Sequence, residues 1–117
     1  MYQDLIDFWF SEDASKHWFN STKDFDLVLT ETYEDTWRQA VRGELDFWAD
    51  NATGSLALVI LLDQFPLNMF RGQATGFSSE AKSRDVAREA IAKGFDQELP
   101  VEQRAFLYLP FMHSENL

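Results

Sequence analysis

Hydrophobic residues recur with a helical period along most of the chain. The clearest case is a stripe of five residues spaced four apart, namely Phe25, Leu29, Tyr33, Trp37 and Val41. This spacing is typical of one face of an amphipathic helix. Ser21 is expected to cap that helix, because its hydroxyl can accept a hydrogen bond from a free N–H of the first turn. Gly43 is expected to end it.

Three other segments show helical spacing. We expect a short helix over residues 4–10 and a helix that begins at Glu80, capped by Ser78 or Ser79, and ends at Gly94. A further helix is expected to start near Pro100 and to stop at Pro110, where the sequence FMHSENL begins a new element.

Residues 56–62 are apolar without interruption, so a helix here would be apolar on every side. A buried parallel strand is the competing interpretation of such a run. No alternation of strands and helices surrounds it, so we predict a central, buried helix over residues 56–65. Pro66 is expected to close it, because proline cannot continue the hydrogen-bond ladder.

The length and composition fit one soluble domain. The 117 residues are 45% hydrophobic and 26% charged, values typical of globular proteins. We predict a single all-α domain over residues 1–117, built from antiparallel helical hairpins. The chain has no cysteine, which suits a reducing cytoplasm and excludes disulfides and thiolate chemistry. No cofactor is predicted, because the sequence has no glycine-rich nucleotide loop.

The net charge is −10 and is unevenly distributed. Residues 1–70 contain 13 acids and 4 bases, whereas residues 71–117 contain 7 acids and 6 bases. An acidic surface repels phosphate backbones, so we expect no nucleic-acid partner. Two interpretations of this surface stay open, a solvated face that aids solubility and a docking face for a basic partner. No membrane span is expected, since the longest apolar run is far below the roughly 20 residues needed.

Four motifs resemble one bacterial family. They are IDFWF at residues 6–10, KHWF at 16–19, LALVILLDQFPLNMFRG at 56–72 and RAFLYLPFMHSENL at 104–117. Together they resemble domain of unknown function 924, whose fold is placed among the tetratricopeptide-like α-α superhelices. The resemblance covers nearly the whole chain and implies that fold, but it implies no activity. Family members usually extend further, so residues 1–117 are expected to be an N-terminal portion of a longer domain, with a minimal member of the family as the alternative.

Asp63 ends the apolar run, where a carboxylate needs a partner because burial is costly and the helix C-terminus disfavours negative charge. Arg71, across the proline turn, is the nearest candidate, with Gln64 and Asn68 able to assist. One interpretation is a polar clasp that fixes the angle between two helices. The alternative is a ligand site in which Arg71 holds a carboxylate or phosphate. The family usually has a base at the position of Leu67, so an anion site is weakened here.

A second polar cluster is His113 with Glu115. His113 could act as a general acid or base if Asp63 or Glu115 oriented it. The structural alternative is a partly buried histidine bonded to a backbone carbonyl. Serine hydrolase chemistry through Ser114 is disfavoured because adjacent Ser and His side chains seldom face each other. A metal site is disfavoured by the poor ligand spacing.

The leading hypothesis is a non-catalytic protein or peptide interaction module. Its polar contacts would be Asp63, Arg71, Glu80 and His113. The alternative is an enzyme or binding protein for an anionic metabolite, with a polar cleft around Asp63, Arg71 and His113. A third possibility is a homodimer that completes the superhelix.

The four tryptophans are expected to lie in the core, with an apolar groove as the alternative. They are Trp9, Trp18, Trp37 and Trp48.

Overall fold

The computed structural model describes residues 1–114, with side chains described for residues 1–112, and this part of the chain contains helices and no strand. The α-helices are α1 (Tyr2–Trp9), α2 (Glu12–Ser15), α3 (Lys23–Val41), α4 (Ala52–Asp63), α5 (Phe65–Met69), α6 (Glu80–Ala92) and α7 (Val101–Ser114). Three short 3-10 helices connect them, η1 (Asp46–Asp50), η2 (Ala74–Phe77) and η3 (Phe95–Glu98). The all-α fold class predicted from the sequence is confirmed.

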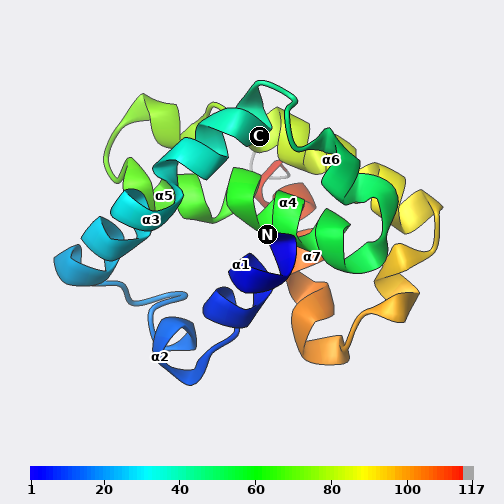
Figure 1. The fold of residues 1–117 in the computed structure, drawn as a ribbon, viewed down its shortest axis with the longest axis horizontal. Coiled ribbons are helices and arrows are strands. Elements are labelled where there is room, and N and C mark those ends of the chain that lie inside the picture. Colours follow the sequence, from blue (N-terminus) through cyan, green and yellow to red (C-terminus); the bar gives the residue numbers. More distant parts are fainter. Residues whose placement is uncertain (115–117) are drawn as a thin grey trace.

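Helix α4 is the centre of the fold. Its residues from Leu56 to Leu62 are fully buried, and α1, α3, α6 and α7 pack around it (Figure 1). The helix begins at Ala52, earlier than predicted, because the Asn51 side chain accepts a hydrogen bond from Gly54 N at 2.8 Å and caps the first turn. Residues 50–55, with the sequence DNATGS, are therefore largely helical. The predicted central, buried helix is confirmed.

The segment Ala52–Met69 has the length and composition of a candidate membrane span. In the folded chain 83% of it is buried by the surrounding helices. A buried core helix that is apolar on every side has the same length and composition as a membrane span. The segment is therefore accounted for by its place in the core.

Helices α4 and α6 run antiparallel, and two serines hold them together. Ser79 Oγ donates to Leu62 O at 2.6 Å, and Ser83 Oγ donates to Val59 O at 3.2 Å. Ser79 also accepts a hydrogen bond from Trp37 Nε1 at 3.1 Å. Ser79 occupies the N-cap position of α6, but its side chain makes no capping bond because the hydroxyl is used between helices.

Three sequence-based boundaries or burial predictions are wrong. Thr22 caps α3 in place of Ser21: its hydroxyl accepts from Phe25 N at 3.2 Å, while the Ser21 hydroxyl donates to Asp26. Val41 belongs to the predicted apolar stripe but is 45% exposed, because the stripe has rotated away from the core at the end of the long helix.

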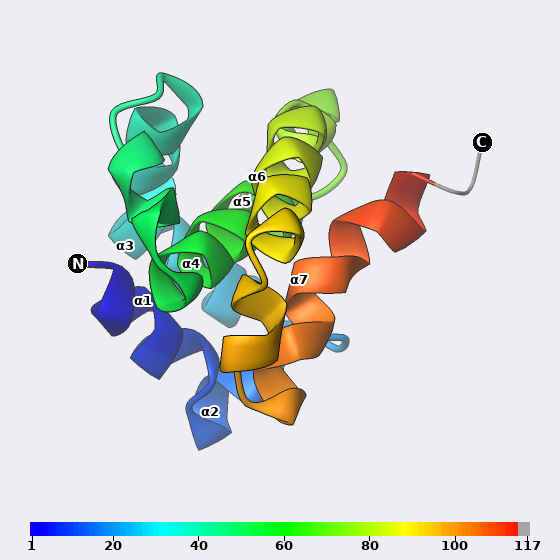
Figure 2. The same cartoon turned by 90° about the vertical axis from the view of Figure 1, so that its right-hand side faces the viewer.

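Pro110 does not end its helix, since α7 continues to Ser114. A proline inside a helix removes one backbone bond and bends it, and the end of α7 turns away from its start (Figure 2).

Three of the four tryptophans lie in the core as predicted. Trp9, Trp37 and Trp48 are buried. Trp18 is half-buried, and its Nε1 donates to Trp9 O at 2.9 Å. The tryptophans therefore serve packing between helices more than they line a groove.

Candidate functional site

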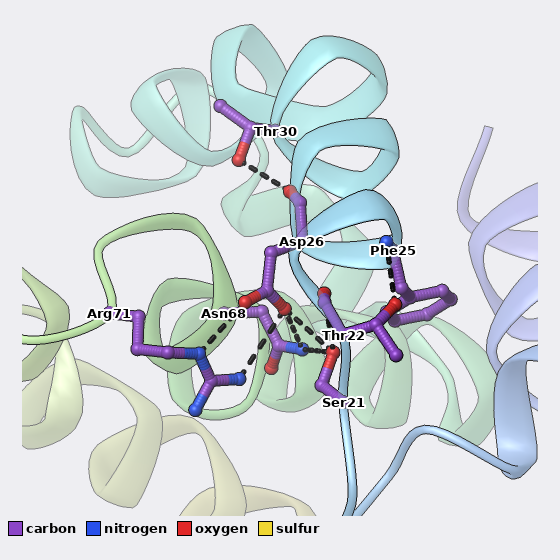
Figure 3. A network of polar contacts seen from close by, with 7 residues as sticks. All are labelled: Ser21, Thr22, Phe25, Asp26, Thr30, Asn68 and Arg71. Carbon is purple, nitrogen blue, oxygen red and sulfur yellow. Dashed lines mark hydrogen bonds and ion pairs between the residues drawn. The ribbon is translucent and has the colours of Figure 1, made fainter.

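Four polar side chains meet at the first turn of α3. Arg71 Nε donates to Asp26 Oδ2 at 2.8 Å, and Arg71 Nη2 lies 3.4 Å from Asp26 Oδ1 (Figure 3). Asn68 Nδ2 donates to Asp26 Oδ1 at 2.9 Å, and Ser21 Oγ donates to the same oxygen at 2.7 Å. The Asp26 side chain is 15% exposed, whereas that of Arg71 is 60% exposed. Asp26 is thus the centre of the network, and it fixes α3 against α5.

The predicted pairing of Arg71 with Asp63 is wrong. Asp63 is buried at the end of α4, and it accepts a hydrogen bond from Gln64 Nε2 at 2.8 Å. Helix α5 separates it along the chain from Arg71, which emerges at the surface beside α3 (Figure 3). Proximity in sequence predicted Asp63 as the partner, but the packing of α5 on α3 brings Asp26 closer.

Opposing effects set the pKa of Asp26. Burial alone would raise the pKa of this carboxyl, because desolvation disfavours the charged form. Hydrogen bonds from Arg71, Ser21 and Asn68, together with the charge of Arg71, outweigh burial and hold the pKa below its ordinary value of 3.8. Asp26 is therefore ionised at neutral pH and holds the surrounding donors in place.

Among the described side chains, the predicted site residues Asp63, Gln64 and Glu80 do not take part in this network. Glu80 is the first residue of α6, and within the described part of the chain its side chain makes no hydrogen bond or ion pair. His113 lies in the α7 backbone, but its side chain is outside the described residues, as is the whole of Glu115. The predicted convergence of His113 with Asp63 therefore stays a prediction.

A cleft opens on the opposite side of the same α3 turn. Phe25 lies on the other side of this turn from Arg71, and its ring points away from the polar network (Figure 3). The cleft has a volume of about 400 Å³ and lies between α3 and the α1–α2 segment. We call it the α2–α3 cleft, and it is lined by Phe8, Ser11, Asp13, Ala14, His17, Thr22, Asp24, Phe25 and Val28.

Stacked rings form one wall of the α2–α3 cleft. The Phe25 ring stacks on Phe8 with centroids 6.0 Å apart and planes 6° apart. It also stacks on His17 at 4.4 Å and 20°. His17 Nδ1 is buried and has no hydrogen-bond partner among the residues that the structure describes. The wall is therefore built of stacked rings and is largely apolar, as expected of a surface that receives an apolar group.

The rim of the cleft is acidic. Asp13 and Asp24 are exposed, and within residues 1–112 neither forms an ion pair. Each lies in the first turn of its helix, where the helix dipole favours a carboxylate. The nearby Lys16 and Lys23 do not line the cleft. The mouth therefore presents negative charge beside an apolar wall.

A second, larger cleft of about 460 Å³ lies between η1, α4 and α6. Four of its five charged residues are paired: Lys82 Nζ lies 2.9 Å from Asp46 Oδ1, and Arg88 Nη1 lies 2.9 Å from Asp85 Oδ1. Glu89 forms no ion pair within the described part of the chain. Lys82 also donates to Ala40 O at 2.7 Å. The second cleft therefore carries one unpaired acid, whereas the α2–α3 cleft carries two and has no lysine or arginine in its lining.

Within residues 1–112 no three His, Cys, Asp or Glu side chains gather as a metal site would require. The α2–α3 cleft was not predicted from the sequence. Its aromatic members, Phe8, His17 and Phe25, come from three separate segments with no shared spacing. The KHWF motif at residues 16–19 was the one available signal.

Comparisons with known proteins identify relatives without an assigned activity. A family model described as "Bacterial protein of unknown function (DUF924)" matches residues 5–117. The chain is also similar to the solved structure of a protein of unknown function from Agrobacterium tumefaciens, with 41% identity and a TM-score of 0.90. The match covers 96% of this chain and 63% of that protein, so this chain spans less than two thirds of its relative. No curated protein matches the chain.

Proposed function

The chain belongs to the DUF924 family of bacterial proteins, and because that description carries no activity we propose a function from the geometry of the α2–α3 cleft. We propose that the chain is a non-catalytic interaction module and that this cleft holds an apolar side chain of a partner protein. The cleft differs from the predicted contacts, since Asp63, Arg71 and Glu80 do not line it. The network of Arg71 and Asn68 with Asp26 lies on the other side of the same α3 turn.

The observation that supports the proposal is an apolar cleft open to solvent. Val28 lines it and is 52% exposed, although an exposed valine gains nothing in stability from contact with water. Phe8 and Phe25 are only partly buried in the same place. A volume of about 400 Å³ lies within the range of binding pockets. Covering this surface with a partner side chain would remove apolar area from water.

The alternative of an anionic-metabolite site has less support. Arg71 was its predicted anchor, but the Nε edge of the guanidinium already contacts Asp26, whose charge offsets that of Arg71. Leu67 adds no positive charge after the DQFP sequence. An acid–base role for His113 stays a prediction.

Peptide selection against the purified chain tests the proposal. A display library of random 12-residue peptides would be selected on the wild-type chain and then tested against Val28→Lys, which places a charge inside the cleft. Leu27→Lys is the matched control, since Leu27 is 57% exposed, adjacent in sequence, and outside the cleft. We expect peptides that bind wild type and Leu27→Lys but not Val28→Lys. Equal binding to all three proteins, or no enriched peptide, would overturn the proposal.

The remaining partner and location hypotheses stay predictions. They are a cytoplasmic location, the absence of nucleic-acid and membrane partners, a tetratricopeptide-like superhelical arrangement, and a homodimer. The net charge of −10 supports the absence of nucleic acid, because like charges repel. The buried position of Ala52–Met69 is consistent with a protein that does not insert into a membrane.

A further inference from the structure

We infer that the partner segment that enters the α2–α3 cleft presents a large apolar side chain flanked by lysine or arginine. This inference rests on the proposed function and adds the chemistry of the partner to it. Three features carry it: the apolar wall, the two unpaired aspartates at the rim, and the acidity of the surrounding surface.

The apolar wall selects the anchoring side chain. Phe8, Phe25 and Val28 offer carbon surface, while the polar groups of Ser11 and Thr22 are committed to capping bonds with Ala14 N and Phe25 N. Committed hydroxyls leave few free donors or acceptors in the interior of the cleft. A polar anchor would lose its bonds to water without replacement, so an aliphatic or aromatic anchor is favoured.

The rim aspartates determine which residues of the partner segment are favoured beside its apolar anchor. Asp13 and Asp24 stand on the two helices that border the cleft, α2 and α3, so a segment lying across the cleft meets a carboxylate on either side. No lysine or arginine lines the cleft to neutralise them. Lysine or arginine next to the anchor would form charge-assisted hydrogen bonds with these carboxylates.

The acidity of the wider surface also favours a basic partner segment. Every residue that lines the cleft comes from residues 1–70, where 13 acids outnumber 4 bases. Such an excess attracts cationic partners and speeds their association, and salt screens the effect. At the second cleft, Lys82 and Arg88 pair with two of the three lining acids, so the excess of negative charge is smaller there. Charge complementarity therefore points to a basic segment at the α2–α3 cleft.

Two synthetic peptides test this inference. Both are acetylated and amidated nonamers with a central Leu-Phe anchor, and they differ only in carrying four flanking lysines or four flanking glutamines. Binding to the ¹⁵N-labelled full chain would be followed from the amide shifts of Thr22, Phe25 and Val28. Single Asp13→Asn and Asp24→Asn variants test the rim. Asp35→Asn, an exposed aspartate on α3 outside the cleft, is the matched control.

We expect the lysine peptide to shift the cleft amides and to bind at least about fivefold more tightly than the glutamine peptide at low salt. Each rim variant should weaken the lysine peptide about two- to fivefold and leave the glutamine peptide unchanged. Asp35→Asn should change neither. Equal binding of both peptides at the cleft would overturn the inference and leave the proposed function standing. Shifts that avoid the cleft amides, or no shifts with either peptide, would overturn both.

Discussion

Asp26 and Arg71 are 45 residues apart in the sequence, yet their ion pair joins the first turn of α3 to the residue that follows α5 by two positions. Ser21 and Asn68 complete the coordination of the same carboxylate. The consequence is that the α3 end that carries Thr22, Asp24 and Phe25 is held in a fixed position. The polar network therefore holds the α3 turn from the side opposite the α2–α3 cleft.

Removing the charge of Asp26 should lower stability in a pH-dependent way. The pKa of folded Asp26 is below the value of about 3.9 expected for the unfolded chain. Its stabilising contribution is therefore complete above about pH 4 and is lost as the pH falls through the folded pKa. Asp26→Asn should lower the free energy of unfolding by about 1–2 kcal/mol at pH 7, because three donors lose a charged acceptor and Arg71 is largely exposed.

Urea unfolding of wild type and Asp26→Asn between pH 7 and pH 3 measures this effect. Asp24→Asn is the matched control, since it also removes an acid from the first turn of α3 but makes no side-chain bond to Arg71. The difference between wild type and Asp26→Asn should shrink below about pH 4. A difference that is the same at both ends of the range would show that the charge of Asp26 does not contribute.

Ser79 should be more important for stability than its exposed neighbour. Ser79→Ala leaves the buried Trp37 Nε1 and Leu62 O without their shared partner. An unsatisfied buried group costs about 1–3 kcal/mol, so thermal unfolding should show a loss of that size. Ser78→Ala removes only a surface bond to Thr75 O and should change the free energy of unfolding by less than about 0.5 kcal/mol. Similar losses for both variants would contradict the bridging role of Ser79.

Gly54 should not accept a side chain. A Cβ at this position would fall inside contact distance of the Trp48 carbonyl oxygen, a backbone atom that cannot swing away. Gly54→Ala should therefore lose at least about 2 kcal/mol of stability, although alanine favours helices. Gly72→Ala, with φ of +78° and open space around it, should lose only about 1 kcal/mol. Chemical denaturation would measure the free energy of unfolding of both variants. A larger loss for Gly72→Ala than for Gly54→Ala would be inconsistent with the close approach of η1 and α4.

The sequence was sufficient to predict the helices with strong patterns. The unbroken apolar run of residues 56–62 predicted the central position of α4, because no face of such a helix can meet water. The predicted helix boundaries failed for two separate reasons. Ser21 could not cap α3 because its hydroxyl bonds to Asp26, and Pro110 bent α7 without ending it.

The candidate site was less predictable for a physical reason. Local spacing indicates which residues share a helix face, but the partner of Arg71 was decided by how α5 packs on α3. The same limit applies to the α2–α3 cleft, where Phe8, His17 and Phe25 meet only after three segments fold together. The acidity of residues 1–70 was visible in the sequence, although its place on the surface was not.

The most direct measurement uses the absence of cysteine in this chain. A single Val28→Cys variant provides one thiol in the α2–α3 cleft, and Leu27→Cys provides one thiol outside it. The rate of alkylation by a maleimide would be measured with and without the lysine-flanked Leu-Phe peptide at saturating concentration. A cleft that holds the peptide anchor predicts slower alkylation of Val28→Cys and an unchanged rate for Leu27→Cys. An unchanged rate at Val28→Cys while the peptide is bound would contradict the cleft as the binding site.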